Sequence, residues 1–286
     1  MREKDRVWEK RLRGKNRLKE KILAVLSWSA AIFTISTLAF IVGFILIKGI
    51  PYIKPSLFAL KYTSENVSLM PALISTIIMT LMALLIAAPL GIAAAIYLVE
   101  YAKRGNIAVS LVRTTTETLS GIPSIVYGLF GLLFFVTYLG WGYSMLSGAL
   151  TLSIMILPLI MRSSEEALKA VPETYREGAF GLGAGKLRTV FRIILPSAMP
   201  GILAGIILAI GRIVGETAAL IYTAGTVAQI ASNPMQSART LSVHMYALSS
   251  EGLHTNEGYA TAVVLLVVVV LINAASAQIV KRLGRK

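Results

Sequence analysis

Long uncharged blocks dominate the pattern of hydrophobic and polar positions along this sequence. Asp, Glu, Lys and Arg are absent from five segments, 22–47, 66–99, 118–161, 193–211 and 258–280. Each segment supplies the roughly 20 apolar residues with which a helix crosses a hydrocarbon core, and 118–161 is long enough for two such helices. Continuous apolar runs also lack the alternation of a β-barrel strand. The pattern therefore predicts an all-α membrane protein with six transmembrane helices.

These blocks divide the chain into three parts. A cytoplasmic basic tail is expected over 1–21, followed by a first transmembrane helix and an outer loop over 22–69. The core, 70–282, then holds five transmembrane helices, which we expect at 70–99, 119–139, 145–162, 196–222 and 258–280. A basic inner loop is expected at 100–118 and a long outer loop at 224–257. The first apolar block is longer than the apolar region of a cleavable signal, so we expect it to be retained.

The positions of the charges change this picture more than their number does. Hydrophobic residues make up 56% of the 286 residues, charged residues 15%, and the net charge is +14. If the tail is cytoplasmic, 23 of the 28 Lys and Arg residues fall on the inner side and four on the outer side. This positive-inside bias places both termini in the cytoplasm. It also explains the basic tail as a partner of anionic membrane lipid, so nucleic-acid binding is the weaker interpretation.

The sequence contains no motif for catalysis, nucleotide binding or metal binding. The segment Gly181–Lys186 superficially resembles a phosphate-binding loop, but Phe180 stands at the first glycine position and Leu187 follows the lysine. The histidines, His244 and His254, stand alone in the predicted outer loop, and there is no cysteine. We therefore expect no enzyme activity, no catalytic or metal-binding residue and no cofactor.

The inner segment 163–196 predicts a helical protrusion. Pro172 suits the start of a helix, and 173–182 mixes apolar and polar positions. Glycines at 181, 183 and 185 interrupt that helix, and a second short helix is expected at 186–195. A simple linker would not need two short helices with apolar faces. The segment is therefore predicted to dock onto another protein.

A longer pattern in this segment resembles the cytoplasmic loop signature of bacterial ABC importer permeases. Glu177-Gly178-Ala179 is followed after three residues by Gly183, and after nine more by Ile193-Ile194-Leu195-Pro196. Gly178 is the one departure from the family's Glu-Ala-Ala. The resemblance implies a type I importer permease (MetI-like) fold. It also implies that Glu177, Ala179 and Gly183 couple the membrane helices to a separate ATPase subunit.

Arg212 and Glu216 lie in the fifth predicted span, where ionisable residues are costly and by default functional. Their spacing of four places both side chains on one helix face, so that they could pair. A guanidinium fits the oxygen pair of a phosphate or carboxylate, and Arg212 lies roughly 24 Å along the helix, in its outer half. Gly211 and Gly215 permit close approach of a neighbour. The residues predict either part of an anion path or a structural ion pair.

Two strings of residues narrow this prediction. Gly211-Arg212-Ile213-Val214-Gly215-Glu216-Thr217-Ala218 resembles a segment of phosphate importer permeases, and the string 119–131 resembles their helix 3. Together with the docking signature, the resemblance covers 70–282, and the short first outer loop favours the A type (PstA). It implies a substrate path that contains Arg212, Glu216, Gly215 and Thr217.

The resemblance further implies a transport machine in a prokaryotic cell (inner) membrane. This chain would pair with a C-type permease subunit, two ATP-binding ATPase subunits and an extracytoplasmic phosphate-binding protein. The nearest alternative is a permease for another oxyanion, such as sulfate, molybdate or tungstate. An ion-driven secondary transporter or channel would leave the 163–196 segment without a role. A membrane scaffold protein would not explain an intramembrane arginine.

Overall fold

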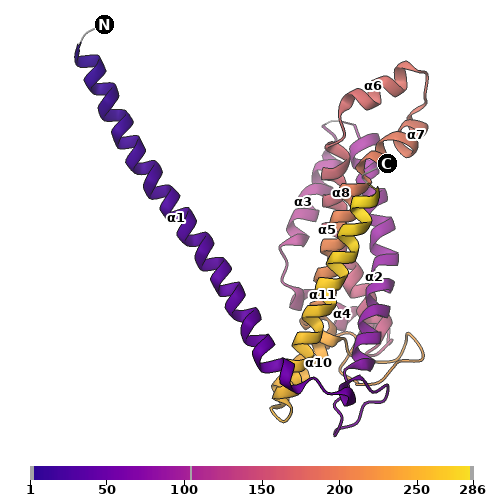
Figure 1. Cartoon of the computed structure of the whole chain (residues 1–286). Coiled ribbons are helices and arrows are strands. Elements are labelled where there is room, and N and C mark those ends of the chain that lie inside the picture. The colour runs from indigo at the N-terminus through magenta and orange to yellow at the C-terminus, as the bar shows by residue number, and fades with distance from the viewer. Residues whose placement is uncertain (1–2, 104, 284–286) are drawn as a thin grey trace.

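The computed structural model describes residues 3–103 and 105–283, which form helices and connecting loops without a β-strand (Figure 1). The helices are α1 (Glu3–Gly49), α2 (Met70–Ile96), α3 (Ile107–Ser120), α4 (Ser124–Gly131), α5 (Met145–Lys169), α6 (Glu173–Gly181), α7 (Lys186–Thr189), α8 (Leu195–Val214), α9 (Ala218–Ile221), α10 (Leu241–Glu251) and α11 (Thr255–Leu283). Tighter or wider helical turns adjoin them: η1 (Ile50–Tyr52), η2 (Pro55–Phe58), η3 (Tyr97–Tyr101), η4 (Leu132–Tyr138) and η5 (Val190–Ile194). Residues 1–2 of the predicted tail, Arg104 of the predicted inner loop and residues 284–286 lie outside the described residues. The predicted all-α class is confirmed.

α5 is the centre of the helical bundle and packs against both α2 and α8. Its side chains Leu152 and Ile160 are fully buried, and Ser153 Oγ donates a hydrogen bond to Ala83 O of α2 at 3.2 Å. At Gly91 of α2, an added Cβ would lie 2.9 Å from the Ile160 side chain. Small residues at such positions let membrane helices approach closely. The bundle is therefore held by interlocking shapes and a few interhelical hydrogen bonds.

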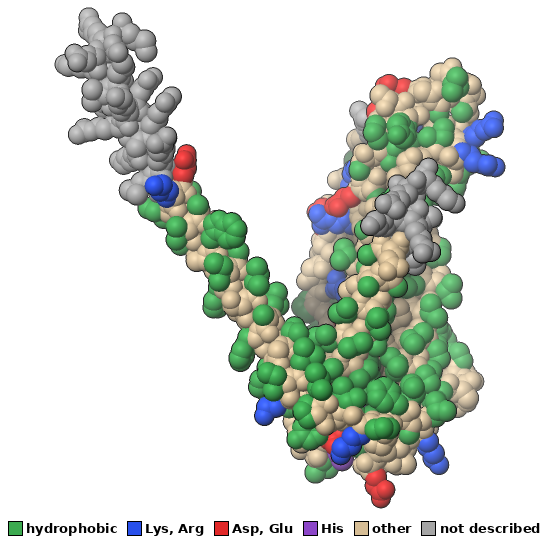
Figure 2. Space-filling model, viewed as in Figure 1, with side chains coloured by type: hydrophobic (Ala, Val, Ile, Leu, Met, Phe, Trp, Pro, Cys, Tyr) green, Lys and Arg blue, Asp and Glu red, His purple; other side chains and the backbone are tan. Residues whose placement is uncertain are grey.

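α1 leaves the bundle at an angle and is uncovered along most of its length (Figure 1). An apolar membrane-length stretch of 18 residues within Lys19–Tyr52 has no buried residue, and the surface of α1 is largely hydrophobic (Figure 2). Contact is confined to its C-terminal end, where the Phe44 ring packs edge-on against Tyr259 of α11 at 5.9 Å and Gly49 abuts the Tyr259 backbone. The first predicted span is helical as expected, and its apolar surface is left for lipid or another protein.

The described residues contain five helices long and apolar enough to cross a membrane, and up to six crossings if one bent pair forms a single span. In that pair, Ile107–Ser120 and Ser124–Tyr138 are bent by 101°. The continuous helix predicted at 119–139 is therefore wrong. Gly121-Ile122-Pro123 interrupts it, because proline lacks an amide hydrogen and disfavours the helical conformation in the residue before it.

α3 replaces the basic inner loop predicted at 100–118. The Asn106 side chain caps its first turn by accepting the Ala108 N–H at 2.9 Å. Arg113 of α3 forms an ion pair with Glu165 of α5 at 2.7 Å. The polar positions that suggested a loop instead form one face of an amphipathic helix, pinned to the bundle by this pair.

Three further boundaries differ from the prediction. The second short helix expected at 186–195 is the start of one helical run, Lys186–Val214, made of α7, η5 and α8. That run stops eight residues before the predicted end at 222, and α9 follows after a break. The outer loop expected at 224–257 contains α10, which forms because Leu241 and Val243 are fully buried against the bundle.

The N-terminal end of α1, the C-terminal end of α11 and the α6–α7 hairpin lie toward the same end of the molecule (Figure 1). We call this the hairpin end, and the end that carries α10 the opposite end. That both termini are cytoplasmic stays a prediction.

Candidate functional site

Backbone geometry at two positions builds the α6–α7 hairpin. Pro172 precedes α6 with φ −55° and ψ 139°, as predicted for the start of this helix. Gly183 has φ +79°, a left-handed conformation that glycine adopts without strain. Its N–H donates to Phe180 O at 2.9 Å, and the Ala184 N–H donates to Ala179 O at 3.0 Å. These bonds close α6 and turn the chain into α7, which confirms the predicted glycine break.

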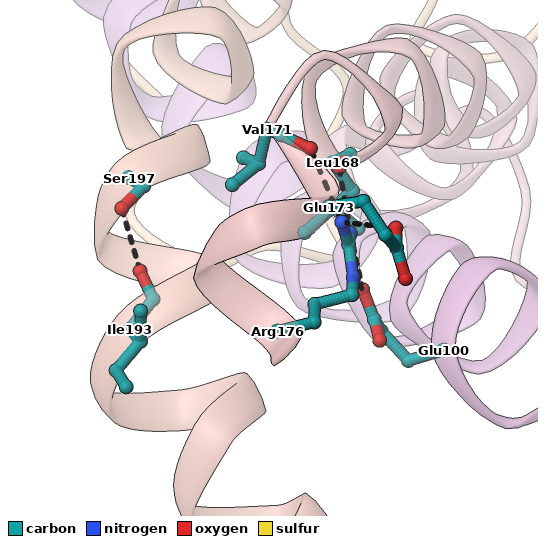
Figure 3. Close-up of polar contacts among 7 residues, drawn as sticks. All are labelled: Glu100, Leu168, Val171, Glu173, Arg176, Ile193 and Ser197. Atoms are coloured by element: carbon teal, nitrogen blue, oxygen red, sulfur yellow. Dashed lines mark hydrogen bonds and ion pairs between the residues drawn. The ribbon is translucent and has the colours of Figure 1, made fainter. Parts of the chain in front are cut away.

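Arg176 ties the hairpin to the bundle (Figure 3) and is 9% exposed. Its Nε and Nη2 donate to Glu100 Oε1 at 3.1 and 2.7 Å. Nη1 donates to Glu173 Oε2 and to Val171 O, both at 3.1 Å, and Nη2 also donates to Leu168 O at 3.1 Å. The hydrogen bond to Glu100 raises the pKa of Arg176 above its ordinary value, so Arg176 keeps its positive charge. A charge-assisted network of this kind fixes α6 to the ends of α2 and α5.

The docking residues predicted from the sequence occupy different faces of this hairpin. Ala179 is buried, whereas Glu177 and Gly183 are exposed. Large apolar side chains are exposed around them: Tyr175, Phe180, Leu182, Leu187 and Phe191. We call these five side chains the hairpin surface. An uncovered apolar surface of this kind is typical of an interaction site.

Arg212 and Glu216 do not form the pair that their spacing predicted. Arg212 is half-buried in the last turn of α8 and makes no hydrogen bond or ion pair with any described residue. Glu216 lies beyond the helix end, is 8% exposed, and its Oε1 accepts the Ala219 N–H at 3.0 Å. The pair is lost because Gly215, a poor helix former, ends α8, and the Glu216 carboxylate instead stabilises the positive start of α9.

Gly215 and Thr217 make up the break between α8 and α9. The Gly215 N–H donates to Gly211 O at 3.2 Å and so closes the last turn of α8. Thr217 is half-buried, and its Oγ1 donates to Gly215 O at 3.4 Å. The four predicted path residues, Arg212, Gly215, Glu216 and Thr217, thus lie together at a helix terminus, where Arg212 is half-buried and Glu216 is buried.

The two strings that carry the phosphate-permease resemblance pack against each other. α4, within the string 119–131, contacts α9. Gly128 is required there, since a Cβ at this position would lie 2.8 Å from Ala219 Cα. The Tyr127 hydroxyl is also close enough to Arg212 for an electrostatic interaction. Segments far apart in the sequence therefore build one surface beside Arg212.

Two features of the structure escaped the sequence reasoning. Arg176 adjoins Glu177 in the docking signature, but no spacing in the sequence links it to Glu100 at the end of another helix. His244, expected to be an ordinary loop residue, is fully buried in α10. Within the described parts of the chain, no group of three or more His, Cys, Asp or Glu residues could hold a metal ion.

Comparison of sequences identifies relatives of this chain. Residues 87–286 match the family described as binding-protein-dependent transport system inner membrane component. The phosphate transport system permease protein PstA of Xylella fastidiosa strain Temecula1 is 34% identical over 89% of this chain and 93% of that protein. A probable ABC transporter permease protein, YqgI of Bacillus subtilis, is 38% identical over 59% of this chain. That alignment spans 62% of the Bacillus protein, less than two thirds of its length.

Comparison of structures identifies a shared fold. A bacterial alginate ABC transporter superposes with a TM-score of 0.69, 16% identity, and coverage of 95% of this chain and 98% of that one. The inward-facing MetNI methionine ABC transporter superposes with a TM-score of 0.58, 21% identity, and coverage of 74% and 93%. These likenesses concern the fold alone, and they confirm the expected type I, MetI-like architecture.

Proposed function

Because this chain belongs to the family of binding-protein-dependent transport system inner membrane components, we propose that it is the A-type permease subunit of an ATP-driven importer of inorganic phosphate. Family and fold make it a multi-pass, non-catalytic permease subunit of an ABC importer in the inner membrane. A permease of this family works with an ATPase and a binding protein. Phosphate, the C-type partner subunit and the cytoplasmic position of both termini are the proposed refinements. The ion-driven secondary transporter and the scaffold protein are no longer alternatives.

The packing around Arg212 is the observation that supports phosphate as the substrate. The two strings shared with phosphate importer permeases meet at Gly128 and Ala219, beside a guanidinium that has no partner among the described residues. PstA proteins are among the relatives that align over most of this chain. An unpaired arginine fork is suited to the oxygens of a phosphate ion.

Glu216 supplies the other half of the proposed path. Its Oε1 accepts the Ala219 N–H of α9, while Oε2 forms no hydrogen bond with a described residue although the side chain is buried. That oxygen is available to accept a hydrogen bond from the protonated oxygen of phosphate, which sulfate lacks at neutral pH. Arg212 then supplies positive charge to the path and Glu216 supplies selectivity.

The hairpin surface is the proposed docking site for the ATPase. Gly183 turns the hairpin and Ala179 is buried within it, while Glu177 is exposed beside the hairpin surface. Arg176 fixes α6 to Glu100. Displacement of the hairpin is therefore passed to α2 and α5. ATP binding closes the ATPase subunits, draws the docked hairpins together and opens the path outward, and hydrolysis resets it.

Crosslinking tests the docking proposal, because the chain contains no cysteine. Leu182→Cys places one thiol at the tip of the hairpin, where the side chain is 91% exposed, and Leu253→Cys places a matched thiol at the opposite end, where it is 83% exposed. A bifunctional thiol reagent should join only the Leu182→Cys variant to the ATPase. Equal crosslinking of both variants, or crosslinking of Leu253→Cys alone, would refute the proposed docking site.

Transport assays test the path. In proteoliposomes that contain the complete transporter, Arg212→Gln should lower ATP-dependent phosphate uptake by on the order of tenfold or more, the effect of losing a charge-assisted hydrogen bond. Arg212→Lys keeps the charge and should retain more uptake. Unchanged uptake by Arg212→Gln would remove Arg212 from the path.

Competition by other oxyanions tests the substrate. Glu216→Gln keeps an amide oxygen to cap α9 but loses the negative charge, so sulfate should compete better with phosphate in this variant than in the wild type. Unaltered discrimination would count against the role of Glu216. If the wild-type transporter takes up sulfate, molybdate or tungstate in preference to phosphate, the oxyanion permease is the correct function.

A further inference from the structure

A buried positive side chain lies without a counter-charge at the opposite end of the molecule. Arg239 precedes α10 and is 6% exposed. Its Nε and Nη2 are buried without a hydrogen-bond partner, and it forms no ion pair with any carboxylate in the described residues. Nη1 likewise has no partner there, but it is open to solvent. Buried guanidinium groups are normally paired with an anionic group. An anion from outside the described residues is therefore needed to neutralise Arg239.

One aromatic side chain lies against Arg239, and a second packs on the first. Tyr62, from the loop before α2, places its ring against the guanidinium, with 4.7 Å between Arg239 Cζ and the ring centroid. This cation–π contact offsets part of the cost of burial but satisfies no N–H group. The His244 ring meets Tyr62 edge-on at 6.1 Å between centroids.

His244 provides a second unsatisfied polar group. It is 0% exposed, and neither ring nitrogen forms a hydrogen bond of normal geometry with a described residue, although the Val67 backbone lies close enough to interact weakly with the ring. Burial and the charge of Arg239 lower the pKa of His244 to about 3, and the Val67 backbone opposes this shift only in part. The ring is therefore neutral at neutral pH and carries one N–H donor.

The first turn of α10 adds a positive electrostatic contribution. Thr240 precedes this turn without capping it through its side chain, and its hydroxyl instead lies 3.1 Å from Ser242 Oγ. Arg239 thus adjoins a helix start, and both favour an anion. The helix start alone would not specify a site, but the buried and unsatisfied side chains of Arg239 and His244 do.

The cluster is joined directly to the proposed path. Ser242 Oγ donates to Glu216 O at 2.6 Å, and the Leu241 N–H donates to Thr76 Oγ1 of α2 at 2.8 Å. The start of α10 is therefore held against the break between α8 and α9. An ion bound at Arg239 would lie at the same end of the molecule as that break.

We propose that Arg239, His244 and Tyr62 form a receiving site for a small oxyanion, from which the ion passes to Arg212 and Glu216. Arg239 supplies positive charge and N–H donors, His244 supplies a neutral donor, and Tyr62 orients the guanidinium. A free oxyanion fits better than a protein carboxylate, because nearly all of the cluster is buried and only Nη1 is open to solvent. The identity of the ion as phosphate rests on the proposed function, whereas the anion site does not.

Ligand-dependent stability of the intact transporter tests this site. The complete complex in lipid nanodiscs, without the binding protein, is melted in increasing sodium phosphate, with chloride holding the ionic strength constant. A bound ion should raise the melting midpoint. Arg239→Gln should raise the half-saturating phosphate concentration by about tenfold or more. Lys61→Gln, which removes an exposed positive charge from the neighbouring loop, should match the wild type.

Further variants keep the test decisive. If the Arg239→Gln transporter fails to assemble, two milder variants replace it. Arg239→Lys keeps the positive charge but loses the forked guanidinium, and His244→Asn keeps one N–H donor. Each should still raise the half-saturating phosphate concentration. A phosphate response equal to that of the wild type in these variants would overturn the site. Loss of a partner subunit from the Arg239→Gln complex, with an intact phosphate response, would also overturn the site, since Arg239 would then pair with a carboxylate of that subunit.

A panel of ions separates this proposal from the proposed function. Sulfate and molybdate are titrated in the same assay. An Arg239-dependent response to one of these ions but not to phosphate supports the site and contradicts phosphate as the substrate. Phosphate uptake without any Arg239-dependent response refutes the site and leaves the proposed function standing.

Discussion

α1 and α5 are both helices of membrane-spanning length, but they stand in opposite relation to the rest of the chain. The membrane-length stretch of α1 is 0% buried, whereas that of α5 is 67% buried. Yet α1 is the more apolar of the two and α5 the least apolar of the five long spans. Hydropathy therefore indicates that a segment enters the membrane, but not whether protein or lipid surrounds it.

The difference follows from the forces that act inside a bilayer. Lipid tails are as apolar as leucine, so apolar character alone gives helices no reason to associate. Both helices carry serine, threonine and glycine, but only in α5 do these residues meet another helix: Ser153 Oγ lies 3.2 Å from Ala83 O of α2, and Gly148 lies against the Met79 side chain. In α1, Thr37 bonds only within its own helix, Gly43 has no neighbour among the described residues, and large side chains such as Phe33 remain exposed. The fit between facing surfaces, and not the presence of small or polar residues, distinguishes the central span.

The largest expected contrast comes from truncating one leucine in each helix. Leu152→Ala in α5 removes a fully buried side chain and should lower the free energy of unfolding by about 2 to 4 kcal/mol, because the cavity cannot fill. Leu38→Ala in α1, where the side chain is 59% exposed, should cost about 0.5 kcal/mol or less. Detergent-titration unfolding of the purified transporter measures both. Equal costs would mean that a partner subunit buries α1 as tightly as this chain buries α5.

Enlarging one glycine in the α2–α5 contact and one in α1 also tests the difference in packing between α5 and α1. Gly91→Leu forces a side chain into the α2–α5 contact, where even a Cβ lies 2.9 Å from Ile160, and should cost about 1 to 3 kcal/mol. Gly43→Leu is the matched control, because no described atom lies within 4 Å of a Cβ at that position of α1. Thermal melting reports both variants. If Gly43→Leu destabilises the assembled transporter as much, α1 packs on a partner through its small residues.

The same contrast between buried and exposed positions applies to the two histidines, His244 and His254. His244, faced by the charged Arg239 and the Tyr62 ring, has its pKa lowered by burial to about 3, against about 6.5 when unfolded. Below pH 6.5 the unfolded chain gains a proton that the folded chain does not. Stability is therefore full above about pH 6.5 and falls as the pH drops toward 3, by about 1.4 kcal/mol at pH 5.5.

Melting at pH 7.5 and 5.5 measures this effect. His244→Asn should reduce the loss of stability between the two pH values, while His254→Asn, which alters the partly exposed histidine before α11, should not. An identical loss in the wild type and His244→Asn would show that His244 is not buried in its neutral form.

The smallest expected contrast concerns one hydroxyl in each helix. Ser153 Oγ donates to Ala149 O at 2.7 Å and to Ala83 O of α2 at 3.2 Å, so Ser153→Ala should cost about 0.6 kcal/mol, as interhelical hydrogen bonds in membranes do. Thr37 Oγ1 in α1 donates only within its own helix, to Phe33 O at 2.9 Å, and Thr37→Val should be near neutral. Comparison of unfolding midpoints under identical conditions resolves the two. A larger cost for Thr37→Val would reverse the contrast.

Local signals in the sequence located the hairpin more accurately than the path. Pro172 and Gly183 act on their own backbone, so the start and the break of α6 were predictable. The sequence correctly predicted that Arg212 and Glu216 lie near each other. It wrongly predicted that they pair, because that pairing requires α8 to continue through Glu216. Gly215 ends α8, and the Glu216 carboxylate engages Ala219.

The sequence by itself determined the class of the protein, the membrane segments and the hairpin, because charge-free length, charge asymmetry and turn residues act locally and need no partner. Only the tertiary structure decided that α5 forms the centre while α1 stands apart, and that Arg176 meets Glu100. It also decided that Arg239 and His244 are buried together. These outcomes depend on contacts between segments distant in sequence, and the energy of such contacts comes from complementary shape and charge that no single segment contains.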